Sequence, residues 1–122
     1  MKIFRMPAPA NSTGDAIPYF HGGKYHIFSL TSPKGTTVYP ARLRTTWDHH
    51  ISDDLANWTQ LPAAIKPGDK DDDPDASGIW TGDAISAEAQ WHAFYTGHAL
   101  KRPYQQTICH ATSPDGVTWT KD

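Results

Sequence analysis

An internal repeat is the feature that most constrains the fold of this chain. The five residues 13–17 (TGDAI) return unchanged as residues 81–85. Each copy is followed by a short apolar stretch rich in aromatic residues, at 25–28 in the first half and at 91–95 in the second. A repeat of this length indicates an array of similar structural units, each too small to bury its own apolar face.

A second pair of matching segments extends the repeat. Residues 52–58 and 113–119 share a serine, an aspartate and a tryptophan at the same spacing. Between the segments, Gly22-Gly23 separates two apolar runs, as in a β-hairpin. No window of a dozen residues carries a sustained 3.6-residue apolar period, so the chain is expected to be all-β.

These patterns predict two four-stranded antiparallel units, each typical of a propeller blade. Strands are expected at 15–20, 25–30, 43–52 and 57–61, and again at 79–85, 90–96, 106–112 and 117–120. The chain then divides into an irregular lead-in (1–12), a first blade (13–68), an acidic interblade loop (69–78) and a second blade with an incomplete last strand (79–122). Because a propeller closes with at least about four blades, we expect either further C-terminal blades or a homo-oligomer.

Charge and composition exclude several classes of partner. The formal net charge is −2, whereas nucleic acids and anionic membranes favour basic surfaces. No apolar run approaches the roughly 18 residues that span a bilayer. The first ten residues have no apolar core of a secretory signal, which favours the cytoplasm. The single Cys109 excludes an internal disulfide and is expected to be a small buried residue.

The ordered motifs resemble those of five-bladed β-propeller glycoside hydrolases, above all family 32, with families 43 and 68 related. Residues 14–20, followed by the Lys24–Phe28 strand, are similar to the family's opening blade. Further similarities follow in order along the chain: residues 47–58 resemble the family's Trp-Gly-His-Ala-x-Ser-x-Asp-Leu-x-x-Trp, residues 61–65 and 77–82 its Leu-Pro and Ser-Gly-Ser elements, and residues 94–97 and 111–116 two further signatures. The resemblance implies a partial five-bladed propeller that acts on or binds fructoside- or arabinoside-type carbohydrates, with no cofactor.

The resemblance also implies catalytic roles. Asp15 matches the family's nucleophile, although Ala16-Ile17-Pro18 replaces the family's Pro-Asn-Gly. The family's transition-state-stabilising Asp and its acid/base Glu belong to later blades, so this chain alone is expected to be catalytically incomplete. From the residues alone, the alternative is that Asp15 caps a turn by binding backbone N–H groups. The alternative function is a non-catalytic carbohydrate-binding or self-assembling module.

Four other residues are candidates for substrate binding. Trp47, His49 and Trp80 are expected to form a wall for a sugar ring, and Asp83, the repeat equivalent of Asp15, is a possible second carboxylate or else a turn residue. The remaining repeat tryptophans are assigned to packing: Trp58, Trp91 and Trp119.

No metal site is expected. The adjacent His49 and His50 point to opposite faces of a strand and cannot chelate one ion together. The Asp69–Asp75 run has the carboxylates of a calcium loop without its glycine and glutamate, and is interpreted as a solvated loop.

Overall fold

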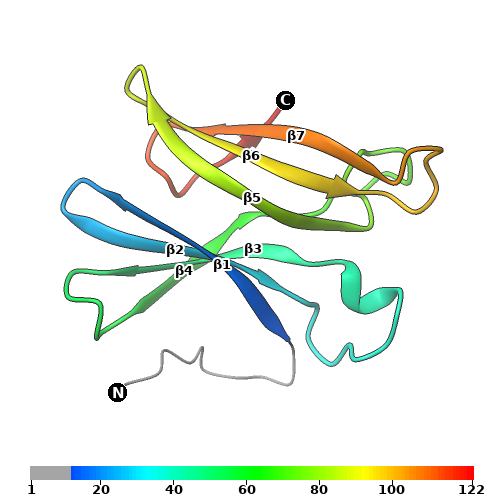
Figure 1. The fold of residues 1–122 in the computed structure, drawn as a ribbon, viewed down its shortest axis with the longest axis horizontal. Coiled ribbons are helices and arrows are strands. Elements are labelled where there is room, and N and C mark those ends of the chain that lie inside the picture. Colours follow the sequence, from blue (N-terminus) through cyan, green and yellow to red (C-terminus); the bar gives the residue numbers. More distant parts are fainter. Residues whose placement is uncertain (1–11) are drawn as a thin grey trace.

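The computed structural model describes residues 12–122, so residues 1–11 of the expected lead-in lie outside the described part. Two four-stranded antiparallel sheets make up this described part (Figure 1), each with its strands in sequence order. The first contains β1 (Thr13–His21), β2 (Lys24–Thr31), β3 (Thr46–Ser52) and β4 (Thr59–Ile65), and the second β5 (Gly78–Ala87), β6 (Gln90–His98), β7 (Gln106–Ser113) and β8 (Thr120–Lys121). The predicted all-β class with two four-stranded units is confirmed.

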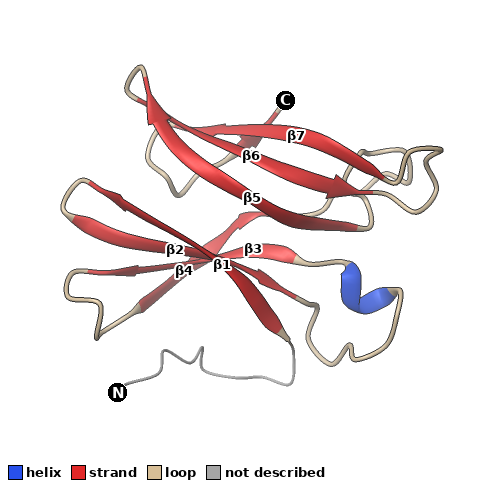
Figure 2. Cartoon of the chain, in the orientation of Figure 1, coloured by secondary structure: helices blue, strands red, loops and turns tan. Residues whose placement is uncertain are grey.

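The helical content of the described residues is one 3₁₀ turn, η1 (Ala41–Leu43), drawn in blue in Figure 2. The sequence predicts a third strand at 43–52, but this turn occupies its expected start, and β3 begins only at Thr46. The expected fourth strand, 57–61, is displaced to Thr59–Ile65, because Asp54 binds the N–H groups of Ala56 and Asn57 in a turn. No helix among residues 12–122 is long and apolar enough to cross a membrane.

Both units open with the same kind of hairpin. The β1–β2 turn places Gly22 and Gly23 at φ +59° and +77°, the left-handed conformation that a two-residue type I′ turn requires. The β5–β6 turn uses Glu88 and Ala89 at φ +51° and +60°. The predicted hairpin at Gly22-Gly23 is therefore confirmed, and the second unit repeats it without glycine.

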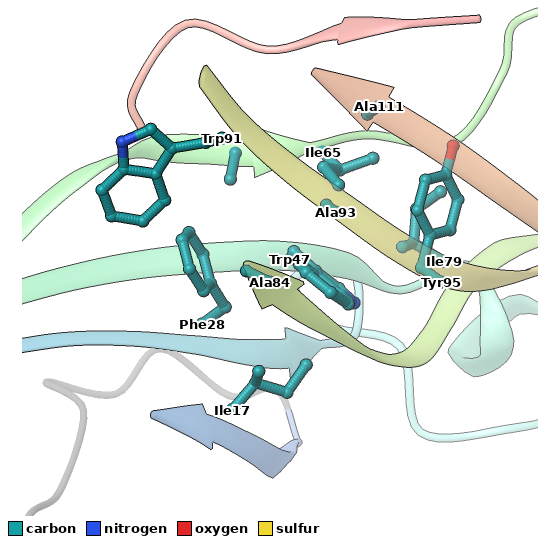
Figure 3. Packing of buried hydrophobic residues seen from close by; sticks show 11 residues of the cluster. Ile17, Phe28, Trp47, Ile65, Ile79, Ala84, Trp91, Ala93, Tyr95 and Ala111 are labelled. Carbon is teal, nitrogen blue, oxygen red and sulfur yellow. The ribbon is translucent and has the colours of Figure 1, made fainter. Parts of the chain in front are cut away.

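The hydrophobic core lies between the two sheets (Figure 3). Phe28 and Trp47 from the first sheet face Trp91, Ala93 and Tyr95 from the second. The Trp91 ring meets three residues of the first sheet edge-on, Tyr19 at 4.8 Å, His21 at 4.8 Å and His26 at 4.9 Å, a favourable geometry for aromatic pairs. Trp91 thus has the packing role predicted for it. Trp119 packs at 5.9 Å from Phe28.

The acidic interblade loop is not solvated throughout. Asp75 is 1% exposed, and its carboxylate accepts hydrogen bonds from the Gly68 N–H at 2.9 Å, the Tyr95 hydroxyl at 2.9 Å and Lys121 Nζ at 2.9 Å. The expectation of a solvated loop is therefore wrong at this position. A buried carboxylate is tolerated because a cation and two further donors satisfy it.

Cys109 is half-buried rather than buried, and it packs against the edge of the core. Burial is the main reason that the pKa of its thiol is raised, and the neighbouring Asp75 carboxylate adds to the effect.

Candidate active site

Asp15 occupies an irregular point of β1. The β1–β2 register shifts between Gly14 and Ile17, and Asp15 has φ +47°, in the left-handed region that aspartate tolerates better than most residues. Such a bulge directs a side chain out of the regular ladder. The exposed Asp15 carboxylate accepts a hydrogen bond from the Thr81 hydroxyl on β5 of the other sheet.

The two sheets meet beside this contact. The Ile79 N–H donates to the Thr45 carbonyl at 3.0 Å, and Trp47 Nε1 donates to the Trp80 carbonyl at 2.9 Å. These bonds hold the start of β5 against the segment before β3 and against β3 itself. The second TGDAI copy is thereby placed beside the first.

A pocket of about 320 Å³ lies at this junction, within the size range of small-molecule sites. It is lined by Ser12, Thr13, Gly14, Asp15, Leu30, Ser32, Arg42, Leu43, Thr45, Trp80 and Thr81. The pocket brings together a carboxylate, a guanidinium and an indole. A sugar needs such a combination, because its hydroxyls bind charged groups and its apolar face packs on an aromatic ring.

Trp80 is the aromatic residue of this pocket. Its ring is half-buried and stacks on His98, with ring centroids 4.2 Å apart and planes 14° from parallel. The stacking limits the rotation of the indole. Of the expected sugar-binding wall, Trp80 is the member that lies beside Asp15.

Trp47 and His49 lie in the core instead. Both are 0% exposed, because they project from a central strand toward the face that the second sheet covers. Trp47 packs 6.1 Å from Tyr95, and His49 stacks 4.4 Å from Phe28. Neither residue has surface for a sugar ring in this structure, which corrects their assignment to the wall.

Asp83 does not line the Asp15 pocket. The exposed carboxylate of Asp83 accepts the Ala84 N–H at 2.8 Å. This contact is with the neighbouring backbone, as in the alternative to a second catalytic carboxylate. The structure therefore does not bring Asp15 and Asp83 into one pocket.

Histidine pairs are a feature of the repeat that the sequence analysis missed. His26 and His49 hydrogen-bond at 2.9 Å in the first sheet, and His92 and His110 at 3.0 Å in the second. Burial, followed by the charges of His26 and His50, lowers the pKa of His49 to about 3. Among residues 12–122, no three side chains of the metal-binding types are grouped to hold an ion.

Arg42 and Thr81 were also missed as pocket residues. Thr81 belongs to the second copy of the repeated pentapeptide, so the repeat itself was a usable signal for it. Arg42 lies in η1, in a segment without periodicity or repeat, and the sequence carried no signal for it.

Comparisons with known proteins agree on one family. The model of the "Glycosyl hydrolases family 32 N-terminal domain" matches residues 15–122. A "Probable sucrose-6-phosphate hydrolase" of Psychromonas ingrahamii is 37% identical over 105 residues, covering 84% of this chain and 18% of the relative. A sucrose-6-phosphate hydrolase of Zymomonas mobilis is 32% identical over 108 residues, covering 84% of this chain and 20% of the relative.

A solved structure with the same fold is fructan 1-exohydrolase IIa from Cichorium intybus, with a TM-score of 0.77 and 28% identity, covering 98% of this chain and 22% of that one. Sucrose-6-phosphate hydrolase from Lactobacillus gasseri superimposes with a TM-score of 0.73 and 26% identity, covering 90% of this chain and 22% of that one. The chain spans about a fifth of the length of these relatives.

Proposed function

Since the chain belongs to glycosyl hydrolase family 32, we propose that it is the nucleophile-bearing part of a hydrolase that cleaves fructosides. The Asp15 carboxylate attacks the anomeric carbon of the fructosyl unit, and the glycosidic C–O bond breaks. A second carboxyl group, from outside residues 12–122, protonates the leaving oxygen. Water then hydrolyses the fructosyl ester on Asp15.

The observation that carries this proposal is the shared position of Asp15, Thr81 and Trp80 in one sugar-sized pocket. The Thr81 hydroxyl donates to the carboxylate, which fixes the orientation of the carboxylate in the pocket. The names of the relatives, sucrose-6-phosphate hydrolase and fructan 1-exohydrolase, support a fructosyl group as the substrate.

The proposal includes catalytic incompleteness of this chain alone. Glycoside cleavage requires a second carboxyl group about 5–5.5 Å away for retention or about 6.5–9.5 Å away for inversion. Asp15 is the one carboxylate among the described residues that line the pocket. The single glutamate, Glu88, lies in the β5–β6 turn. We expect no turnover of a nitrophenyl fructoside by the 122-residue chain. Robust turnover would contradict the catalytic incompleteness of this chain.

The nucleophile is tested with an epoxide-bearing fructoside and the 122-residue chain. The carboxylate oxygen attacks an epoxide carbon, the ring C–O bond opens, and water protonates the resulting alkoxide. The expected result is one covalent adduct, mapped to Asp15 by peptide mass spectrometry. Asp15→Asn should remove the adduct, and the matched control Asp83→Asn should retain it.

Two outcomes would overturn the assignment of Asp15. One is an adduct on another carboxylate that survives in Asp15→Asn. The other is equal labelling by a simple alkyl epoxide, which would show reactivity without sugar recognition.

A second candidate function, self-assembly, is favoured by the outer face of the second sheet. Phe94 and Ile108, on β6 and β7, are 45% and 76% exposed. The repeat makes Phe94 equivalent to Phe28, which is buried against the second sheet in this chain. A second copy, presenting its first sheet head to tail, could cover this face.

Light scattering tests this candidate. A monodisperse oligomer that Ile108→Lys dissociates, while Tyr104→Ser in a surface loop does not, would support self-assembly. A monomer at all concentrations would exclude it.

A further inference from the structure

We propose that His98 is a positioning residue of the Asp15 pocket, which holds the Trp80 indole in the orientation that packs against a sugar ring. The inference rests on the proposed function of the pocket and adds to it a residue that does not touch the sugar. His98 is buried and does not line the pocket, so it acts only through Trp80.

The strand ladder leaves the side chain of Trp80 without regular support. The register between β5 and β6 shifts between Ile79 and Gly82, so no residue of β6 is paired with Trp80. A bulge of this kind re-aims a side chain and is frequent beside functional sites. The Trp80 carbonyl accepts a hydrogen bond from Trp47 Nε1 at 2.9 Å, which fixes the backbone of Trp80 and leaves its ring to be held by another residue.

His98 supplies this support for the ring. Its imidazole stacks on the indole, with ring centroids 4.2 Å apart and planes 14° from parallel. His98 is paired with Gly78 on β5 and with Gln106 on β7, and it is 3% exposed. The half-buried indole therefore lies on a ring that packing and two strand pairings hold in place.

The polar atoms of His98 indicate that the pocket uses the face of its ring. Its Nδ1 is buried and has no hydrogen-bond partner among residues 12–122, a cost that an apolar side chain would avoid. Burial lowers the pKa of His98, and a hydrogen bond with the backbone of Ser77 partly opposes this shift, so the ring is neutral near pH 7. A neutral ring packs flat on an indole without burying a charge.

Support of the indole matters for sugar binding because of conformational entropy. An indole that turns freely must be immobilised when a sugar binds, and the lost freedom weakens binding. An indole that His98 already holds avoids this loss. We therefore expect His98 to change the affinity of the pocket for a sugar and to leave the reactivity of Asp15 unchanged.

The epoxide-bearing fructoside and the 122-residue chain test the inference. The rate of Asp15 labelling is measured against probe concentration, which gives a half-saturating concentration and a maximal rate. His98→Gln keeps a polar side chain and loses the aromatic face. It should raise the half-saturating concentration about fivefold, the effect of one side chain that must be immobilised on binding, and leave the maximal rate within about twofold.

Two further variants separate the aromatic face from the polar atoms. His98→Phe keeps the face and removes the buried Nδ1, and its half-saturating concentration should lie within about twofold of wild type. His98→Leu fills the same space without an aromatic face and should resemble His98→Gln. It also serves as the test if His98→Gln fails to fold. The matched control is His92→Gln, which removes an imidazole stacked on His110 instead and should change neither value.

Trp80 is tested as the link between His98 and the sugar. Trp80→Ala should raise the half-saturating concentration, and adding His98→Gln to it should cause no further increase, because residues that act through one contact are not additive. In the ¹⁵N-labelled chain without sugar, the indole N–H signal of Trp80 should shift in His98→Gln and stay in place in His92→Gln.

The outcomes separate this inference from the proposed function. Labelling of Asp15 with an unchanged half-saturating concentration in His98→Gln would overturn the inference alone. A loss in His98→Phe as large as in His98→Gln, or additive effects of His98→Gln and Trp80→Ala, would do the same. Absence of Asp15 labelling in the wild-type chain would overturn the proposed function together with the inference.

Discussion

Asp75 shows how a single residue joins distant segments of the chain. Its carboxylate binds Gly68 from the segment between β4 and β5, Tyr95 from β6 and Lys121 from β8. Burial and the nearby Asp75 carboxylate raise the pKa of Tyr95, so its hydroxyl remains a donor. Because Asp75 is almost fully buried, removing it leaves several polar groups without partners.

Asp75→Ala should lower the free energy of unfolding by about 3–5 kcal/mol, the cost of leaving one partner of a buried pair uncompensated. Tyr95→Phe, which removes one hydroxyl, should cost about 1–2 kcal/mol. Asp72→Ala, at an exposed position of the acidic interblade loop, should change the free energy of unfolding by less than about 0.5 kcal/mol. Urea unfolding measures the effect of all three variants. A small effect of Asp75→Ala would show that the contacts of Asp75 do not stabilise the fold.

At the level of elements, the turn after the third strand of each sheet is built twice in the same way. Ser52 Oγ accepts the Leu55 N–H at 2.9 Å, and Ser113 Oγ accepts the Gly116 N–H at 2.8 Å. In each turn the aspartate two residues later accepts two further backbone N–H groups. These backbone bonds lower the pKa of Asp54 and of Asp115.

Ser113→Ala should destabilise the protein by about 1–3 kcal/mol, because the buried Gly116 N–H loses its acceptor. Ser52→Ala should have an effect of similar size in the other sheet. Ser86→Ala, exposed on β5, is the control and should lie within about 0.5 kcal/mol of wild type. Clearly unequal effects of the two turn variants in chemical denaturation would contradict the structural equivalence of the turns.

Across the whole molecule, the contact between the sheets contains a buried histidine pair. His49 is 0% exposed, and its Nδ1 has no hydrogen-bond partner among residues 12–122. The equivalent His110 in the second sheet lies on the outer face, where the Asp122 carboxylate binds its Nδ1. The packing of one sheet on the other therefore requires neutral His49.

Stability should fall as the pH falls from about 6.5 toward 3. Because the pKa of His49 is about 3 in the folded state, the unfolded chain binds the additional proton over this range, and the stabilisation is complete only above pH 6.5. His49 contributes a slope of at most about 1.4 kcal/mol per pH unit. His49→Gln should reduce the slope of unfolding free energy against pH by up to this amount. The control His92→Gln, on the outer face, should retain the wild-type slope.

The repeat and the absence of helical periodicity were enough to predict the two four-stranded sheets, because alternation and turn residues act locally. Sequence reasoning also selected Asp15 and Trp80, which the structure brings into one pocket. It failed for Trp47 and His49, because strand alternation gives two faces and does not say which face the other sheet covers. Thr81 reaches Asp15 only because β5 lies beside β1, and Arg42 reaches the same pocket only because of the position of η1.

The sequence by itself determined that the chain forms strands, how many there are and their order. These properties depend on short-range interactions that are the same in both copies of the repeat. Only the tertiary structure decided which aromatic rings are buried, which aspartate is satisfied in the interior and which side chains line the pocket. These properties depend on how one sheet packs on the other, which involves residues that are far apart in the chain.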